Sequence, residues 1–195
     1  MKNPFQDDDG SFAPLPERVV ALLIEADATA RLVAHLRLVH DVALRLLDGL
    51  SRAWPDLRVD SEAVLFGAAT HDIGKAVQPN ELYEPGATHE AIGRRMLVET
   101  GVEDRLARFA ETHAKWKTSN DCTLEDLLVA LADTCWKGKR SERLDGLVCE
   151  KILGQIGGER WEVFATLDAL IDDLAMGGDQ RLAWQSRYGS SLVSR

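Results

Sequence analysis

Residues 63–75 read AVLFGAATHDIGK, an apolar helix-forming segment that ends on an imidazole and a carboxylate side by side, His71 and Asp72. An ionised carboxylate buried in such a segment costs several kcal/mol unless a positive group meets it. A divalent metal ion would meet both side chains, because imidazole nitrogen and carboxylate oxygen are common protein ligands of metals. The stretch therefore predicts a helix whose C-terminal end, at the following Gly74, carries a metal site.

The rest of the chain supplies further ligands of the same two kinds. Its five histidines all lie in the first two thirds of the sequence, and Asp133 closes an unbroken apolar run over residues 127–132. A carboxylate in a helix that is apolar nearly all round is expected to be buried. The alternative for Asp133 is an ion pair with Lys137, four residues on.

The order of these residues resembles a known family. His35, then His71 and Asp72, then Asp133 is similar to the H…HD…D signature of the HD-domain superfamily of metal-dependent phosphohydrolases. The resemblance spans about residues 30–140. Two further histidines between the doublet and the last aspartate are similar to the subset that holds two metals. The resemblance thus implies six metal ligands: His35, His71, Asp72, His89, His113 and Asp133.

The resemblance also chooses between two histidines of one helix. Five residues turn an α-helix by about 500°, so His35 and His40 lie about 140° apart on opposite sides of its apolar stripe. Periodicity does not separate them. In the family an apolar residue follows the first ligand four positions on and a small one eight on, which Val39 and Ala43 match. His35 is therefore implied as the ligand, and His40 is expected to be bonded locally at the helix edge.

Three basic residues are candidates for contact with an anionic substrate. The resemblance implies that Lys75 lies near the substrate's phosphate; the alternative is a cation that complements the end of a helix, worth about 0.3–1 kcal/mol. Lys137 and Arg140 follow one helical turn past Asp133 and are predicted to bind substrate, although such clusters are usually solvated. Asp72 is expected to act in catalysis with Lys75, by orienting or deprotonating the attacking water.

Helical spacing of apolar residues recurs along almost the whole chain, and no stretch alternates with period two. The sequence therefore predicts an all-α fold, an HD-domain helical bundle with extra C-terminal helices. We expect a flexible tail over residues 1–13 and a single helical domain over 14–195. Within that domain we expect a metal-site core at about 29–140 and a helical cover at about 141–190. Predicted helices span about 15–28, 29–54, 61–72, 89–100, 103–114, 123–136, 141–156 and 159–176, with a short one after them.

Charge and cysteine usage limit the partners. The net charge is 23 − 32 = −9, which disfavours a non-specific grip on nucleic acid or on anionic lipid. Three cysteines without CxxC spacing are expected to be reduced thiols. No apolar run approaches the ~18 residues of a membrane span. We therefore expect a cytoplasmic protein without membrane contact, for which a homodimer remains open.

The favoured function is hydrolysis of a small phosphoester or nucleotide by metal-activated water. Three or four imidazoles with carboxylates suit one or two ions of Fe, Mn, Co, Ni or Zn. Two alternatives remain: an HD-type di-iron oxygenase that cleaves a C–C or C–P bond with O₂, and a catalytically degenerate metal-binding regulatory module. No tyrosine precedes His35, which favours hydrolysis over oxygenation. The Gly-Tyr-Pro triplet of HD-GYP phosphodiesterases is absent after His113, which counts against that class.

Overall fold

The computed structural model describes residues 3–6, 10–119 and 121–189. Every regular element within these residues is helical, so the prediction of an all-α fold is confirmed. The α-helices are α1 (Glu17–Glu25), α2 (Ala30–Ala53), α3 (Ser61–Thr70), α4 (Thr88–Glu99), α5 (Asp104–Ala107), α6 (Phe109–Thr112), α7 (Leu124–Cys135), α8 (Glu142–Ile156), α9 (Arg160–Met176) and α10 (Gly178–Gln185). Three 3₁₀ turns join them: η1 (Ile73–Ala76), η2 (Pro79–Leu82) and η3 (Lys115–Lys117).

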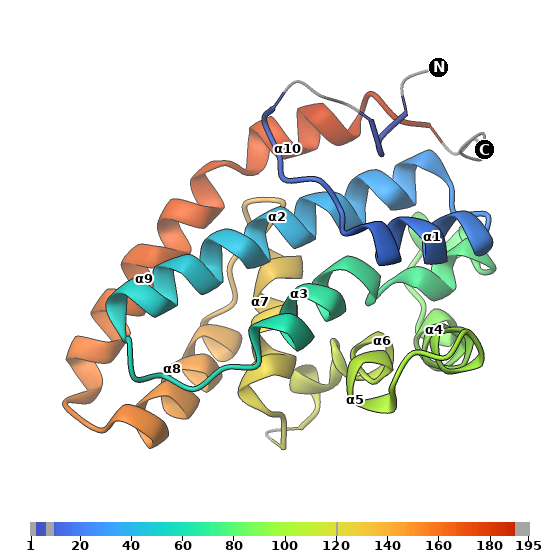
Figure 1. Ribbon diagram of the computed structural model, residues 1–195. Helices are drawn as coiled ribbons and strands as arrows, with labels where there is room; N and C mark the ends of the chain where they lie inside the picture. The colour runs from blue at the N-terminus through green and yellow to red at the C-terminus, as the bar shows by residue number, and fades with distance from the viewer. Residues whose placement is uncertain (1–2, 7–9, 120, 190–195) are drawn as a thin grey trace.

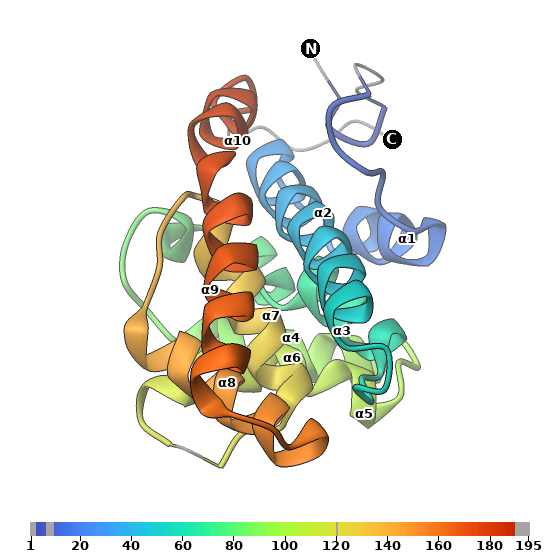
Figure 2. The same ribbon diagram turned by 90° about the vertical axis from the view of Figure 1, so that its left-hand side faces the viewer.

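The long helix α2 organises the bundle. It packs against α3, α7 and α9, and both Figure 1 and Figure 2 show α2 and α9 side by side. Helix α7 lies between α3 and α8, while α4 packs against η1 and α6 on the other side of α3. One core of buried apolar side chains extends through these contacts, from Phe12 to Tyr188. No helix within the described ranges is long and apolar enough to cross a membrane.

Side-chain caps mark the starts of four α-helices among the described residues: α2, α3, α7 and α8. The Asp60 carboxylate accepts a hydrogen bond from the third residue of α3, and Thr123 forms a capping box at the start of α7. Helix α4 begins at Thr88, one residue before the predicted start, and the Thr88 side chain forms no capping hydrogen bond there. The first amides of α4 instead donate to the carboxylate of Glu81, which is supplied by η2.

One predicted helix is divided in the structure. The helix expected over 103–114 is two short helices, α5 and α6, which meet at Arg108. The Arg108 guanidinium reaches the start of α7, where it contacts the carboxylate of Asp126 and the hydroxyl of Thr123. Helix α6 ends at Thr112, so His113 follows as its C-terminal cap residue.

The segment before α1, over which the sequence predicts a flexible tail, contacts α2 in its described parts, residues 3–6 and 10–13. The rest of the predicted tail lies outside the described residues. The buried guanidinium of Arg37 donates to the backbone carbonyls of Pro4, Phe12 and Ala13 at 2.8, 2.8 and 3.0 Å. A buried arginine needs such acceptors, and the sequence does not show that an acidic, polar segment provides them.

His40 also differs from its expected local bonding. Its side chain is buried, and Nδ1 has no hydrogen-bond partner among the described residues. Burial lowers the pKa of His40 to about 4, against an opposing contribution from neighbouring Asp41. The unfolded chain protonates this ring near pH 6.5, whereas the folded chain keeps it neutral down to about pH 4. Its contribution to stability is therefore fully present above about pH 6.5 and is lost as the pH falls.

We expect His40→Gln to reduce the acid sensitivity of folding. Between pH 7 and pH 5 the free energy of unfolding of the wild type should decrease by about 1–2 kcal/mol more than that of the variant. Urea unfolding of metal-free protein at both pH values measures this difference. A difference that does not change with pH would contradict a neutral buried His40.

Candidate metal centre

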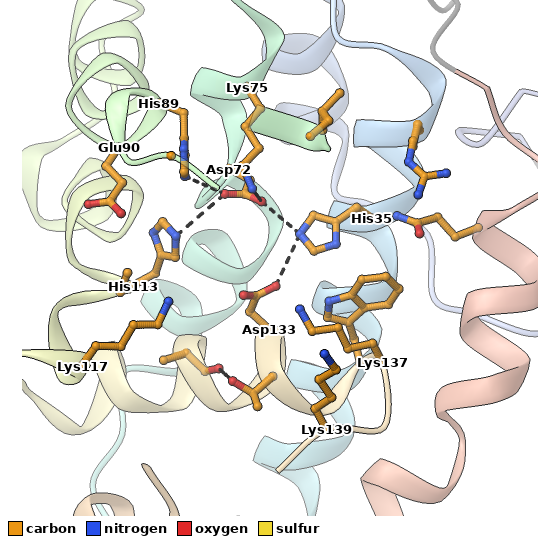
Figure 3. Close-up of a pocket in the computed structure, with 18 of the residues that line it drawn as sticks. His35, Asp72, Lys75, His89, Glu90, His113, Lys117, Asp133, Lys137 and Lys139 are labelled. Carbon is orange, nitrogen blue, oxygen red and sulfur yellow. Dashed lines mark hydrogen bonds and ion pairs between the residues drawn. The ribbon is translucent and has the colours of Figure 1, made fainter. Parts of the chain in front are cut away.

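The six predicted ligands lie close together, although they come from five separate parts of the chain. Figure 3 labels all of them except His71. Helix α2 contributes one histidine, the junction of α3 and η1 the doublet, α4 the next histidine, the end of α6 another, and α7 the last aspartate. Five of the six are buried and the sixth is half-buried. They form two groups of three, in each of which the ligand atoms lie within 4.8 Å of one another.

The first group contains His35, His71 and Asp133. Nε2 of His35 lies 3.3 Å from Nε2 of His71 and 3.4 Å from Oδ1 of Asp133. Nε2 of His71 lies 3.5 Å from the same carboxylate oxygen. Two imidazole nitrogens and one carboxylate oxygen thus converge at a single point, as the ligands of a metal ion do.

The second group contains Asp72, His89 and His113, and Asp72 joins it to the first. Oδ1 of Asp72 lies 3.0 Å from Nε2 of His89 and 3.8 Å from Nε2 of His113. Its other oxygen, Oδ2, lies 3.2 Å from Nε2 of His35. The two oxygens of one carboxylate therefore face different groups, which is the geometry of a bridging ligand.

Backbone carbonyls orient two of the rings. Nδ1 of His71 lies 3.1 Å from the carbonyl of Ala68, and Nδ1 of His113 lies 3.2 Å from that of Phe109. A carbonyl oxygen can only accept, so Nδ1 carries the proton in each ring and the lone pair of Nε2 faces the centre. The helices that carry these histidines thus also select their ligating tautomer.

Glu81 performs the same task for His89, and the sequence did not identify it. Its Oε2 lies 2.5 Å from Nδ1 of His89 and 3.1 Å from the His89 amide nitrogen, and its Oε1 lies 3.2 Å from the amide of Thr88. These hydrogen bonds, that of His89 first, lower the pKa of Glu81 to about 2. Glu81 lies in a segment that the sequence indicates to be a loop, where nothing marks one carboxylate as a partner of His89.

The protonation states of the metal-free cluster differ between its histidines. Against the opposing effect of burial, nearby carboxylates raise the pKa of His71 and that of His89, so a divalent ion would compete with a proton for these two rings. Burial lowers the pKa of His113 to about 4 and lowers that of His35 as well, so both rings are neutral at pH 7. Burial opposes ionisation of Asp72, but His71, His35 and His89 outweigh it and hold the pKa of that carboxyl well below its usual range. Neutral imidazole and ionised carboxylate are the forms that bind metals.

Two buried atoms face each other without a hydrogen bond. Oδ1 of Asp72 and Nε2 of His89 are both buried and have no hydrogen-bond partner among the described residues, although they are 3.0 Å apart. Buried polar atoms are seldom left in this state. Metal coordination would satisfy both, so the donor set fits divalent ions.

A cavity of about 560 Å³ opens over the two groups, and its charged lining is mainly basic. Lys75 points into it, with Nζ 2.6 Å from Oδ2 of Asp72. Lys137 also lines it, as expected for a substrate contact. Two aromatic side chains, Trp116 and Trp136, form part of the wall. The remaining cations of the lining are Arg31, Lys117 and Lys139, none of which the sequence singled out as a site residue.

Arg140 does not line this cavity, which corrects its expected role in substrate binding. Its guanidinium binds the carboxylates of Asp145 on α8 and of Asp168 and Asp172 on α9. A planar fork with several donors suits such multiple carboxylate contacts. Because the two acids on α9 follow Arg140 by 28 and 32 positions, local spacing could not reveal this arrangement.

Comparison with known proteins identifies a family and a similar fold. A family model described as HD domain matches residues 32–135, just over half of the chain. No curated protein sequence matches. One solved structure, the HD domain of the L. monocytogenes phosphodiesterase PgpH in complex with cyclic-di-AMP, is similar with a TM-score of 0.51. It is 17% identical, the similarity covers 84% of this chain and 97% of that one, and at this identity it supports the fold alone.

Proposed function

This chain belongs to the HD-domain family of metal-dependent phosphohydrolases, and from that premise we propose that it hydrolyses a small phosphoester or nucleotide. The observation that carries the proposal is the Asp72 carboxylate, whose two oxygens face two separate groups of ligands. A carboxylate shared by two ion sites would hold two ions close together. Paired ions can stabilise both the attacking and the leaving oxygen when a phosphoester is hydrolysed.

The residues divide into two ion sites and a basic contact. His35, His71 and Asp133 would hold one ion, and Asp72 would share the second with His89 and His113. Bound divalent ions supply an activated water and Lewis acidity toward phosphoryl oxygens. Asp72 also lies where it can orient that water, and Lys75 would offset negative charge on the phosphoryl group.

The cavity favours hydrolysis over the oxygenase alternative. Five cations and three carboxylates line it in a protein whose net charge is −9, so the lining carries an excess of positive charge that attracts an anion. A phosphoester needs such a field, whereas C–C cleavage by O₂ does not require it. The complete set of six ligands also argues against a degenerate regulatory module.

Metal analysis followed by a substrate panel tests the proposal. Protein purified without added metal or chelator should contain about two equivalents of transition metal per chain. With Mn²⁺, Co²⁺, Ni²⁺, Zn²⁺ or Fe²⁺ it should release product from at least one of p-nitrophenyl phosphate, bis-p-nitrophenyl phosphate and a set of nucleotides. Substrate-dependent O₂ uptake by the iron-loaded protein, with no phosphoester hydrolysis under any metal, would reject the proposal.

Glu81→Ala should weaken binding at the second ion site by about 10–100-fold, the usual effect of removing a carboxylate that orients a metal-binding histidine. The first ion site has no contact with Glu81 among the described residues and should keep its metal. Metal content after dialysis against graded chelator measures both sites. The matched control is Glu84→Gln, an exposed glutamate of the same loop; equal metal content in the two variants would contradict this role of Glu81.

A further inference from the structure

Three lysines that line the cavity have no role in the proposed reaction at the ion sites: Lys117, Lys137 and Lys139. Lys75 is bonded to Asp72, whereas Lys117, Lys137 and Lys139 form no ion pair with any carboxylate in the described part of the chain. Many basic residues elsewhere in this acidic protein are paired, among them Arg45, Arg94, Arg105, Arg108 and Arg140. Lys115 and Lys151 form no such ion pair either, but they lie outside the cavity lining, so three of the five described lysines without a carboxylate partner line the cavity.

The three lysines lie on both sides of the ligand cluster. Lys117 belongs to η3, which follows His113, and Figure 3 shows its side chain beside that histidine and Glu90. Lys137 and Lys139 follow the C-terminal end of α7, and Figure 3 shows them on the other side, close to Asp133. A single tetrahedral phosphoryl group at the ions cannot contact both sides equally.

Aromatic rings of the cavity wall accompany two of these ammonium groups. Nζ of Lys117 lies 6.0 Å from the ring centroid of Trp116, and Nζ of Lys137 lies 5.9 Å from that of Trp136. Cations over indole faces at this distance are weakly attracted to the ring. Such contacts favour side-chain positions along the wall and leave the charge available to an anion.

We propose that Lys117, Lys137 and Lys139 form a subsite for a second anionic group, so that the substrate carries at least two phosphoryl groups. Phosphoanhydrides and bisphosphorylated small molecules are the matching chemical classes. One phosphoryl group lies at the ion sites, and a further phosphoryl group of the same molecule extends from it toward Lys117 on one side or toward Lys137 and Lys139 on the other. This inference rests on the proposed function, which makes the ligand cluster the centre of reaction.

Anion binding tests the subsite without requiring turnover. The probes are inorganic pyrophosphate and orthophosphate, titrated by calorimetry into protein kept saturated with Mn²⁺. The wild type should bind pyrophosphate at least about tenfold more tightly than orthophosphate, because charge-assisted contacts to a second phosphoryl group are added. In the triple variant Lys117→Gln, Lys137→Gln, Lys139→Gln this preference should largely disappear, while orthophosphate affinity changes by less than about threefold.

Lys115→Gln is the matched control, since Lys115 lies in η3 beside Lys117 but does not line the cavity. It should keep the full preference. Circular dichroism and metal analysis after each titration verify that the variants are folded and that pyrophosphate has not removed the metal. Equal affinity of the wild type for both anions overturns the proposal, and so does a preference that persists in the triple variant.

The outcome separates this inference from the proposed reaction. A lysine-dependent preference for pyrophosphate in a protein that hydrolyses no phosphoester would support the subsite and reject the reaction. Hydrolysis of monophosphates with no preference for pyrophosphate would support the reaction and reject the subsite.

Discussion

Asp72→Ala should lower metal-dependent turnover at least about a thousandfold. Where several residues act as one catalytic unit, removal of a single member abolishes most of the activity of the whole unit. The two oxygens of Asp72 face the two ligand groups, Oδ2 at 3.2 Å from Nε2 of His35 and Oδ1 at 3.0 Å from Nε2 of His89. Its loss removes a ligand from the second group and the bridge between the two. Turnover on the best substrate of the panel and metal content per chain measure the effect.

The fold should survive this substitution. Asp72 lies after the last residue of α3 and makes no capping bond at the start of η1, so no helix depends on its side chain. Far-ultraviolet circular dichroism should therefore match the wild type. Glu84→Gln is again the control, with wild-type turnover expected. Full activity of Asp72→Ala, or two retained metal equivalents, would reject the assignment of this cluster as the reaction centre.

Short-range signals in the sequence predicted much of the helical framework. Capping residues such as Asp60 and Thr123 satisfy amides within three positions, so they can be recognised without knowledge of the fold. The apolar stripe of α2 is equally local. The choice of His35 over His40 could not be made from periodicity, since both are buried in the structure. It came from the resemblance to the HD-domain family.

Long-range polar partners could not be predicted in this way. Glu81 contacts His89 from η2, Arg37 binds carbonyls more than twenty positions earlier, and Arg140 binds acids on a later helix. Each is explained by the need of a buried or crowded charge for a partner. The sequence indicates that such a charge needs a partner, but which residue becomes the partner depends on how the helices pack. The place of Lys139 in the cavity lining likewise depends on how the helices pack.

Gly74 has a short-range role that the sequence indicates and a long-range contact that only the structure shows. The sequence indicates a glycine that ends a helix, whereas the structure places it inside η1, against the backbone of α4. A Cβ atom at this position would lie 2.1 Å from the carbonyl oxygen of His89 and 2.8 Å from the amide nitrogen of Gly93. Both obstacles are backbone atoms, so no side-chain rotation can relieve the overlap.

Gly74→Ala should therefore destabilise the protein by about 3 kcal/mol, at the upper end of the range for overpacking, and should also release metal from the second site. Metal should be lost because the added methyl group forces α4 away from η1. This movement takes His89 away from Asp72. Urea unfolding and metal content measure the two effects. Gly154→Ala in α8 is the matched control, because nothing lies within 4 Å of its added Cβ; it should stabilise by about 0.5–1 kcal/mol, as alanine does in helices. If the two variants unfold at the same urea concentration and hold the same metal, the close contact between η1 and α4 does not position His89.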